Sequence, residues 1–258
     1  MLERRHLPGG IVALVSQALE ADGFMVAFTE RTGGESSGRF ASLNLGLHVG
    51  DAPVMVRHNR ERLCGALEIA PFACAEQVHG NRHAWVGPDG AAAGFADRAN
   101  AISGVDALFT DSRGVPLAMF VADCVPIALV DRPRRAVGVI HAGWRGLASG
   151  IVASAVTVFE DPAALAAVVG PAVRIDHYEV GEEVAESVSA ATPGGAPTRQ
   201  DGGRLFIDLP GAALAMLEAA GVRHVEEAQE CTACEPDRFF SYRRDGVTGR
   251  QALIASVL

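Results

Sequence analysis

The chain of 258 residues has no cluster of lysine and arginine residues, no long flexible linker and no segment long and apolar enough to span a bilayer. Its 22 basic and 31 acidic residues give a formal net charge of −9 at pH 7. Such a chain lacks the basic surface with which proteins bind nucleic-acid polymers or anionic membranes. We therefore expect a cytoplasmic protein whose partners are small molecules, and neither a nucleic acid nor a membrane.

Cysteine is also scarce. Five cysteines are too few for a disulfide-stabilised scaffold of this length, and they indicate a reducing compartment with free or metal-bound thiols. The length is sufficient to bury a large core, and no linker divides it. We therefore predict one domain over residues 1–258.

The most informative segment is VADCVPIALVDRPRRAVGVIHAGWRG, near the middle of the chain. It contains two apolar runs rich in Val and Ile, residues 125–130 and 136–140, separated by a charged turn. This pattern predicts two strands that pair as an antiparallel hairpin. Cys124 precedes the first strand and His141 follows the second, so the pairing brings a thiol and an imidazole to the same end of the hairpin.

The remaining apolar pattern predicts a mixture of helices and strands. Helical spacing predicts helices at residues 11–21, 53–67, 147–159 and 209–220 and a helical segment that begins at 177; the basic residues of 53–67 are expected to face solvent. Strand-like runs occur at residues 24–28, 107–110, 115–121 and 166–169, whereas residues 192–203 have the composition of a loop.

A second imidazole, His79, closes the short run AEQVHG and is a candidate partner for Cys124 and His141. Three nitrogen and sulfur ligands with an open fourth position are typical of a catalytic zinc site, in which the metal activates water. A thiol and one imidazole alone are sufficient for a cysteine nucleophile. Buried residues with a purely structural role are the third alternative, and spacing alone does not decide among the three.

Cys231 and Cys234 form a Cys-x-x-Cys pair, which is a second candidate for metal or redox chemistry. Cys64 and Cys74 are not spaced as the further pair that a four-cysteine zinc site needs. The signature of zinc nucleobase deaminases, H-x-E followed by P-C-x-x-C, is absent because Glu230 precedes Cys231. We interpret the pair as free thiols, one of which approaches the pocket.

Several segments together resemble a known family. In chain order they are FTERTGG, ASLNLGLHVGD, NRERL, QVHG, VADCVPIAL, HAGWRG, GPA with YEVGEEV, and FFSYRRDGVTGRQ. They are similar to the pattern of the YfiH-like laccase-domain proteins, a family known under two names, polyphenol oxidase and purine nucleoside phosphorylase. The resemblance extends from about residue 28 to the end of the chain. Glu30 and Glu35 depart from it, because the family usually has Thr and Val there.

The resemblance implies a layered α+β fold in which helices flank mixed β-sheets. It also implies a zinc ion, with copper as the alternative, held by the catalytic residues His79, Cys124 and His141. The implied activity is phosphorolysis of adenosine, inosine, guanosine and methylthioadenosine, with phosphate as the co-substrate and deamination of adenosine at the same site. Water activated by the metal would attack the purine carbon that bears the amino group.

Candidate contacts to phosphate are guanidinium groups, because they donate two hydrogen bonds in one plane to an oxyanion. Arg31 lies in a glycine-rich loop that either cradles an anion or forms a surface turn, and Arg145 follows His141 in a glycine-containing turn. These two arginines are our candidates, with Arg244 in reserve. Asn44 is the candidate hydrogen-bond partner of the ribose or the base.

Phe240 and Tyr242 are candidates for stacking on the purine ring, although their segment also fits a solvated hairpin. Asp123, next to Cys124, is a candidate for orienting a metal-bound histidine through a hydrogen bond. The sequence leaves open whether the protein is a monomer or a homodimer.

Three other functions compete with this one. A copper-dependent polyphenol oxidase of the multicopper type should contain repeated H-x-H pairs, and the eight histidines form none. A metal-free hydrolase or amidase would use Cys124 and His141 alone, acting on a cell-wall precursor. The third is a binding module without enzymatic activity.

Overall fold

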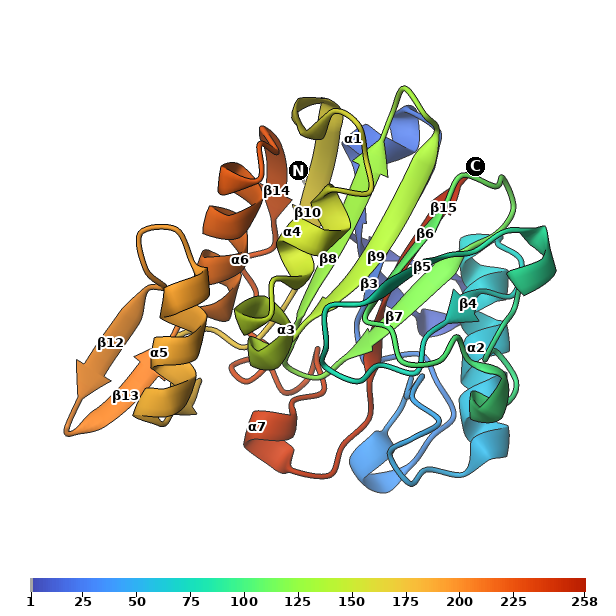
Figure 1. Ribbon diagram of the computed structural model, residues 1–258. Helices are drawn as coiled ribbons and strands as arrows, with labels where there is room; N and C mark the ends of the chain where they lie inside the picture. Colours follow the sequence, from blue (N-terminus) through green and yellow to red (C-terminus); the bar gives the residue numbers. More distant parts are fainter. Residues whose placement is uncertain (1) are drawn as a thin grey trace.

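The computed structural model describes residues 2–258, in which two six-stranded sheets pack face to face (Figure 1). The first sheet has, in spatial order, β1 (Leu2–His6), β2 (Val12–Ser16), β3 (Phe24–Thr29), β15 (Gln251–Val257), β7 (Leu117–Val121) and β4 (Ala73–Cys74). The second has β14 (His224–Glu227), β10 (Leu165–Val169), β8 (Val125–Asp131), β9 (Ala136–Ala142), β6 (Ala107–Thr110) and β5 (His83–Trp85). A small third sheet contains β11 (Glu179–Val180), β13 (Arg204–Ile207) and β12 (Thr198–Asp201).

Helices cover the outer faces of both large sheets. The apolar side of α2 (Pro53–Leu67) packs on the first sheet. The helices on the second sheet are α3 (Trp144–Ala148), α4 (Ile151–Val156) and α6 (Leu209–Ala219), whereas α5 (Glu182–Ala191) packs on α3 and on β13 of the small sheet. Two short helices, α1 (Gln17–Ala21) and α7 (Tyr242–Asp245), lie in connections. These layers confirm the predicted α+β fold with helices flanking mixed sheets.

The central strands are apolar on both faces because both faces are covered. In β8, Ile127 and Leu129 belong to the core under the helices, whereas Ala128 and Val130 belong to the core between the sheets. Burial on both sides explains why this strand is a continuous apolar run without polar alternation. The same two-sided burial positions the ends of β8 and β9 rigidly.

The predicted hairpin is confirmed. β8 and β9 pair antiparallel, with Val125 opposite Ala142 and Pro126 opposite His141. The helix at 53–67 and the strands at 24–28 and 107–110 also occur where the sequence places them. Within α2, however, Arg60 is buried and does not face solvent, because its guanidinium donates hydrogen bonds to the backbone oxygens of Leu45, Gly94 and Phe95.

Four predicted elements were wrong. Residues 11–21 form β2 followed by the short helix α1, and not one helix. The apolar run pairs with β1 on one side and β3 on the other, so it is a strand inside the first sheet. The helix at 147–159 is divided at Gly150, whose φ of 83° ends α3 before α4 begins. The loop at 192–203 contains β12, and the helix expected from 177 begins at Glu182, after β11. Among residues 2–258, no helix is both long and apolar enough to cross a membrane.

Candidate metal and active site

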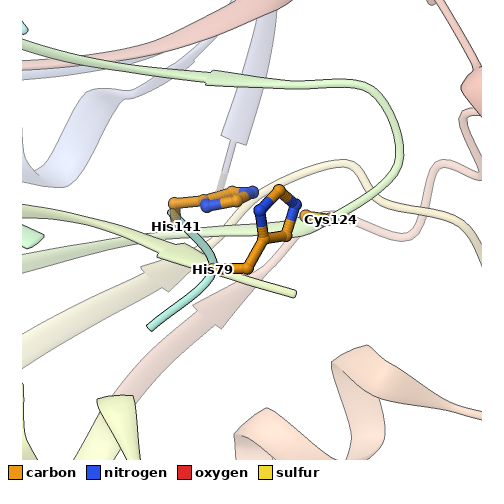
Figure 2. Close-up of side chains that lie close together, drawn as sticks. All are labelled: His79, Cys124 and His141. Atoms are coloured by element: carbon orange, nitrogen blue, oxygen red, sulfur yellow. The ribbon is translucent and has the colours of Figure 1, made fainter. Parts of the chain in front are cut away.

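The end of the β8–β9 hairpin brings together the three residues proposed from the sequence. His141 lies on β9, Cys124 lies in the bend that enters β8, and His79 lies in the loop after β4. One nitrogen or sulfur atom of each lies within 4.8 Å of the others. The two imidazole rings meet edge to face, with their centroids 4.7 Å apart, and all three side chains converge (Figure 2).

A buried carboxylate, Asp106, holds two of these residues in place. Its Oδ1 lies 2.8 Å from His141 Nδ1 and accepts a hydrogen bond of 2.9 Å from the backbone N–H of His79. Its Oδ2 accepts one of 2.7 Å from the N–H of Gly80. With Nδ1 bonded to Asp106, Nε2 is the ring nitrogen of His141 that remains for Cys124 or a metal ion. Asp106 therefore orients one imidazole and the loop that carries the other.

Asp123 was the candidate for this orienting role from the sequence, but the structure gives the role to Asp106. The carboxylate of Asp123 accepts hydrogen bonds of 2.6 Å from Thr232 Oγ1 and from the backbone N–H of Arg243. Asp123 has a φ of 147°, which is rare for a residue with a side chain, and these bonds stabilise it. Its role is to fix the bend from which Cys124 projects.

The cluster is packed closely, and Gly143 is part of the reason. A Cβ atom at position 143 would lie 3.0 Å from both Cys124 Sγ and His79 Cδ2. Any larger residue would displace one of the two side chains. The glycine of the HAG motif therefore leaves room for the thiol and the imidazole to approach each other.

The electrostatic setting favours a thiolate. Burial raises the pKa of Cys124, but the charge of His141 and hydrogen bonds from both imidazoles outweigh burial and lower it to about 6. Burial lowers the pKa of His141, whereas the thiolate and the hydrogen bond to Asp106 raise it to about 9. A thiolate is the form of cysteine that binds metals and attacks electrophiles.

The cluster opens into a cavity of about 660 Å³. Arginines and aromatic residues from several segments border it: Arg98, Arg145, Arg243, Arg250, Phe120, Trp144, Tyr178 and Tyr242. The Arg145 guanidinium stacks on Trp144 at 4.2 Å, and that of Arg243 stacks on Tyr178 at 4.7 Å. The cavity therefore combines positive charge with flat apolar surfaces.

Of the six substrate contacts proposed from the sequence, the structure places Arg145 and Tyr242 at this cavity. Arg31 lies elsewhere and donates to the backbone oxygens of Ala41 and Pro236, so its loop uses the guanidinium for its own carbonyl groups. Asn44 is fully buried and is bonded to Asp51 and to the backbone of Arg250.

The other two proposed contacts also have structural partners. Phe240 is fully buried, with the guanidinium of Arg31 4.4 Å from its ring centroid. Arg244 donates to the backbone oxygens of Thr232 and Phe239 and borders a separate, smaller cavity.

Two residues at the cavity, Gln77 and His48, were not identified as candidates from the sequence. The side-chain amide of Gln77 pairs with the backbone N–H and C=O of Phe120, which ties the His79 loop to β7. Burial, followed by the charges of Arg250 and Arg98, lowers the pKa of His48 to about 4. Both residues lie in the segments QVHG and ASLNLGLHVGD, where the family resemblance was the only available indication.

Comparison with known proteins now identifies the family. A family model described as multi-copper polyphenol oxidoreductase laccase matches residues 25–257. The chain belongs to this laccase family. The purine nucleoside phosphorylase YlmD of Geobacillus stearothermophilus is similar to this member of the family, with 41% identity over 241 residues that cover 88% of each chain. The purine nucleoside phosphorylase YfiH of Escherichia coli is 35% identical over 243 residues, covering 93% of this chain and 96% of YfiH.

The structural comparison agrees. The crystal structure of YlmD from Geobacillus stearothermophilus aligns with this laccase-family chain at a TM-score of 0.91 and 39% identity, covering 95% of this chain and 96% of that one. That of a YfiH protein from Bacillus licheniformis aligns at a TM-score of 0.88 and 32% identity, covering the same shares of the two chains. The names of the relatives support an enzymatic role.

The donor set fits one metal ion in this member of the laccase family. Two imidazoles and one thiolate are ligands that zinc and copper both accept. Asp106 provides the hydrogen bond through which proteins commonly orient a metal-binding histidine. Within residues 2–258, the other group of potential ligands, His177, Cys231 and Cys234, contains a single histidine. Neither group therefore has the number of histidines expected of a multicopper cluster.

Proposed function

We propose that this protein is a zinc-dependent purine nucleoside phosphorylase that accepts adenosine, inosine, guanosine and methylthioadenosine and also deaminates adenosine. The observation that carries the proposal is the His79, Cys124 and His141 cluster at an arginine-bordered cavity. A volume of about 660 Å³ is within the usual range for small-molecule sites. The phosphorylase names of the relatives support the same substrate class.

His79, Cys124 and His141 would hold the zinc, and Asp106 would keep the imidazole of His141 in the tautomer that binds through Nε2. When bound, zinc supplies Lewis acidity, with which water can be activated near neutral pH. The stacked guanidinium groups of Arg145 and Arg243 keep their N–H edges available for phosphate oxygens. Arg145 thus stays a candidate for the phosphate contacts, and Arg243 replaces Arg31 and Arg244.

Phosphorolysis breaks the bond between the purine nitrogen and the ribose and forms a bond from ribose to phosphate. The protein must hold phosphate in line with the bond that breaks. This requires an oxyanion site for phosphate and, beside it in the same cavity, a flat apolar surface for the purine. Tyr242 and Tyr178 border the cavity and offer aromatic faces to the purine. The purine keeps the electron pair of the broken bond and takes a proton from solvent water, so that it leaves as the neutral free base.

A metal-free hydrolase is the second candidate, and one observation favours it. Cys124, His141 and Asp106 have the order of a nucleophile, a base and an orienting carboxylate, with the pKa of the thiol lowered to about 6. His79 is the residue this alternative does not use. The copper phenol oxidase of the family's name is the third candidate, and it requires a redox-active metal at the same three ligands.

The deciding experiment is product analysis. We would incubate zinc-loaded protein with adenosine, with and without phosphate, and separate the products by chromatography. Adenine that appears only with phosphate, and inosine that appears without it, are the expected products. Inosine, guanosine and methylthioadenosine should each release their base only with phosphate.

Two variants and a chelator sharpen the result. Cys124→Ala should reduce both activities by more than the roughly 10–100-fold that loss of a supporting residue costs at a metal site. Cys64→Ala removes a buried thiol from the core beneath α2 and should leave both activities intact. Absence of products from zinc-loaded protein would overturn the proposal. Amide hydrolysis that survives complete chelation would establish the hydrolase, and phenol-dependent oxygen uptake only with copper would establish the oxidase.

A further inference from the structure

A second cluster of nitrogen and sulfur donors lies outside the cavity described above. One donor atom each from His177, Cys231 and Cys234 lies within 4.8 Å of the others. His177 lies in the turn before β11, and the two cysteines lie in the turn after β14. More than fifty residues of sequence separate the two turns, so the tertiary fold alone brings the imidazole to the thiols.

Backbone contacts fix this meeting point. Ala172 and Cys231 form a parallel β-bridge, and the N–H of Thr232 donates to the C=O of Ala172 at 3.1 Å. The N–H of Cys234 donates to the C=O of Cys231 at 3.2 Å, which closes the turn, and the two sulfur atoms lie within 4.8 Å of each other. Cys231 Sγ also accepts a hydrogen bond of 3.4 Å from the N–H of Arg174. Hydrogen bonds of this kind stabilise negative charge on sulfur.

We propose that His177, Cys231 and Cys234 bind a second zinc ion, independent of the one proposed at His79, Cys124 and His141. Two cysteines spaced C-x-x-C with one histidine are a common zinc-binding set, and zinc accepts a fourth ligand from water or a carboxylate. His177, Tyr178 and Glu179 form an H-x-E motif. The chain therefore contains an H-x-E and a C-x-x-C, the two parts of the zinc deaminase signature that carry the metal ligands, but Glu230 stands where that signature has proline.

The surroundings of the cluster are suited to a cation. The carboxylates of Asp176 and Glu235 lie close enough to Cys234 to act on its charge. The same carboxylates that disfavour an isolated thiolate attract a divalent cation to it. A cavity of about 330 Å³ borders His177 and Asp176, so solvent can supply the fourth ligand.

A metal at this point would also brace the wall of the first cavity. Tyr178, which borders that cavity, directly follows His177 in the chain. Thr232, next to Cys231, donates its hydroxyl hydrogen to Asp123, the residue before Cys124. We therefore assign the second zinc a positioning role, because it would join the two turns that carry these contacts.

The test is the zinc content of purified chains after zinc loading and removal of excess metal, measured by mass spectrometry of the elements. The wild-type chain should hold two zinc ions. His177→Ala and Cys234→Ser should each hold one, and so should Cys124→Ala. The matched control Cys64→Ala should hold two. Both His177 and Cys234 are exposed, so these variants should fold, and circular dichroism checks that they do.

The zinc contents of the wild type and of the three ligand variants separate this proposal from the proposed function. If the first site binds no zinc, the wild type and Cys124→Ala hold one ion and Cys234→Ser holds none; the second site then stands. If the wild type, His177→Ala and Cys234→Ser all hold one ion and Cys124→Ala holds none, the second site is overturned.

A spectroscopic measurement examines the same site directly. Cobalt added to Cys124→Ala should produce the absorption of sulfur bound to cobalt, and that absorption should disappear in the Cys124→Ala, Cys234→Ser double variant. Equal absorption in the two would overturn the proposal. So would a disulfide between Cys231 and Cys234 in wild-type protein prepared without oxygen, found as a linked peptide together with a count of three free thiols after denaturation.

Discussion

The two histidine and cysteine clusters of this protein share donor types but differ in how the fold holds them. The first lies at the end of a strand pair covered on both faces, with His141 and Asp106 almost completely buried. The second joins two turns at the surface. Each cluster has one buried donor, His141 or Cys231, but Cys124 is half-buried, whereas His177 and Cys234 are both exposed. The first is therefore fixed by the core, whereas the second depends on a few backbone hydrogen bonds.

This difference indicates what each cluster can do. A catalytic metal needs ligands that hold their geometry while substrate and product exchange, and a preorganised, partly buried set provides this. A metal that joins two turns contributes most where the protein alone is held weakly, because its binding energy adds to the stability of the folded state. Similar ligands are thus expected to serve chemistry in one place and positioning in the other.

The sharpest contrast concerns the two thiols, Cys124 and Cys234, in protein stripped of metal by chelation. Burial acts on both, but His141 lowers the pKa of Cys124 to about 6, whereas Cys231 and nearby carboxylates raise that of Cys234 to about 11. Thiolate is the reactive form, so alkylation of Cys124 should be half-maximal near pH 6 and alkylation of Cys234 should still rise above pH 10.

At pH 7 about one in ten thousand Cys234 side chains is a thiolate, whereas most Cys124 side chains are thiolates. A thiolate of low pKa is a weaker nucleophile, which offsets part of this difference. Cys124 should therefore react with the alkylating reagent roughly 30–100-fold faster than Cys234. Peptide mass spectrometry after timed iodoacetamide treatment measures both sites in one sample. Equal pH profiles for the two thiols would contradict the contrast. Cys64, whose pKa burial raises to about 11, serves as the unreactive reference.

A second prediction concerns the carboxylate behind each cluster. Asp106→Asn replaces an oxygen that accepts backbone hydrogen bonds with an NH₂ group, so buried N–H groups lose their partner and His141 loses its orientation. Zinc affinity at the first cluster should fall by roughly 10–100-fold. Asp176→Asn is the matched change at the second cluster. Asp176 is 71% exposed, and a surface charge of this kind contributes at most about 1 kcal/mol, or less than about fivefold in affinity.

Competition with a chromophoric chelator measures both affinities, each in a background that retains only the site of interest. Cys234→Ser isolates the first cluster, and Cys124→Ala isolates the second. If Asp106→Asn changed zinc affinity no more than Asp176→Asn, the carboxylate behind His141 would have no role in orienting the metal ligand.

The sequence was sufficient to predict the part of the site that depends on local pattern. The two apolar runs, separated by a short turn, indicated two neighbouring strands. Antiparallel pairing of these strands then placed Cys124 and His141 at the same end of the hairpin. The helix predicted for residues 11–21 was wrong because an apolar run of that length fits both helical and strand spacing. Only pairing with the strands β1 and β3 decides between the two.

The rest of the site depended on contacts that no local pattern contains. Asp106 precedes the strand β6, a position that suits any turn residue, and its function appears only when the His79 loop folds over it. Arg31 had a sound local argument, a guanidinium in a glycine-rich loop. The loop's own carbonyl groups take up that guanidinium, because they have to be hydrogen-bonded within the folded protein.

The smallest predicted effect concerns the packing of the first cluster. Gly143 and Gly181 are the N-terminal caps of α3 and α5, and both have extended backbone angles that alanine can adopt. They differ in space: a Cβ at 143 would lie 3.0 Å from Cys124 and His79, whereas none of the neighbouring atoms lies within 4 Å at 181.

Both changes to alanine lose the same preference of a helix cap for glycine, so the difference between them isolates the packing around the ligands. Gly143→Ala should cost about 1–3 kcal/mol more in the free energy of unfolding than Gly181→Ala. It should also weaken zinc at the first cluster, whereas Gly181→Ala should leave both clusters unchanged. Urea unfolding of the metal-free variants, with zinc titration of each, measures the two effects separately. Equal unfolding free energies would mean that the close approach at Gly143 is relieved by movement of the His79 loop, and the first cluster would then be less rigid than its burial indicates.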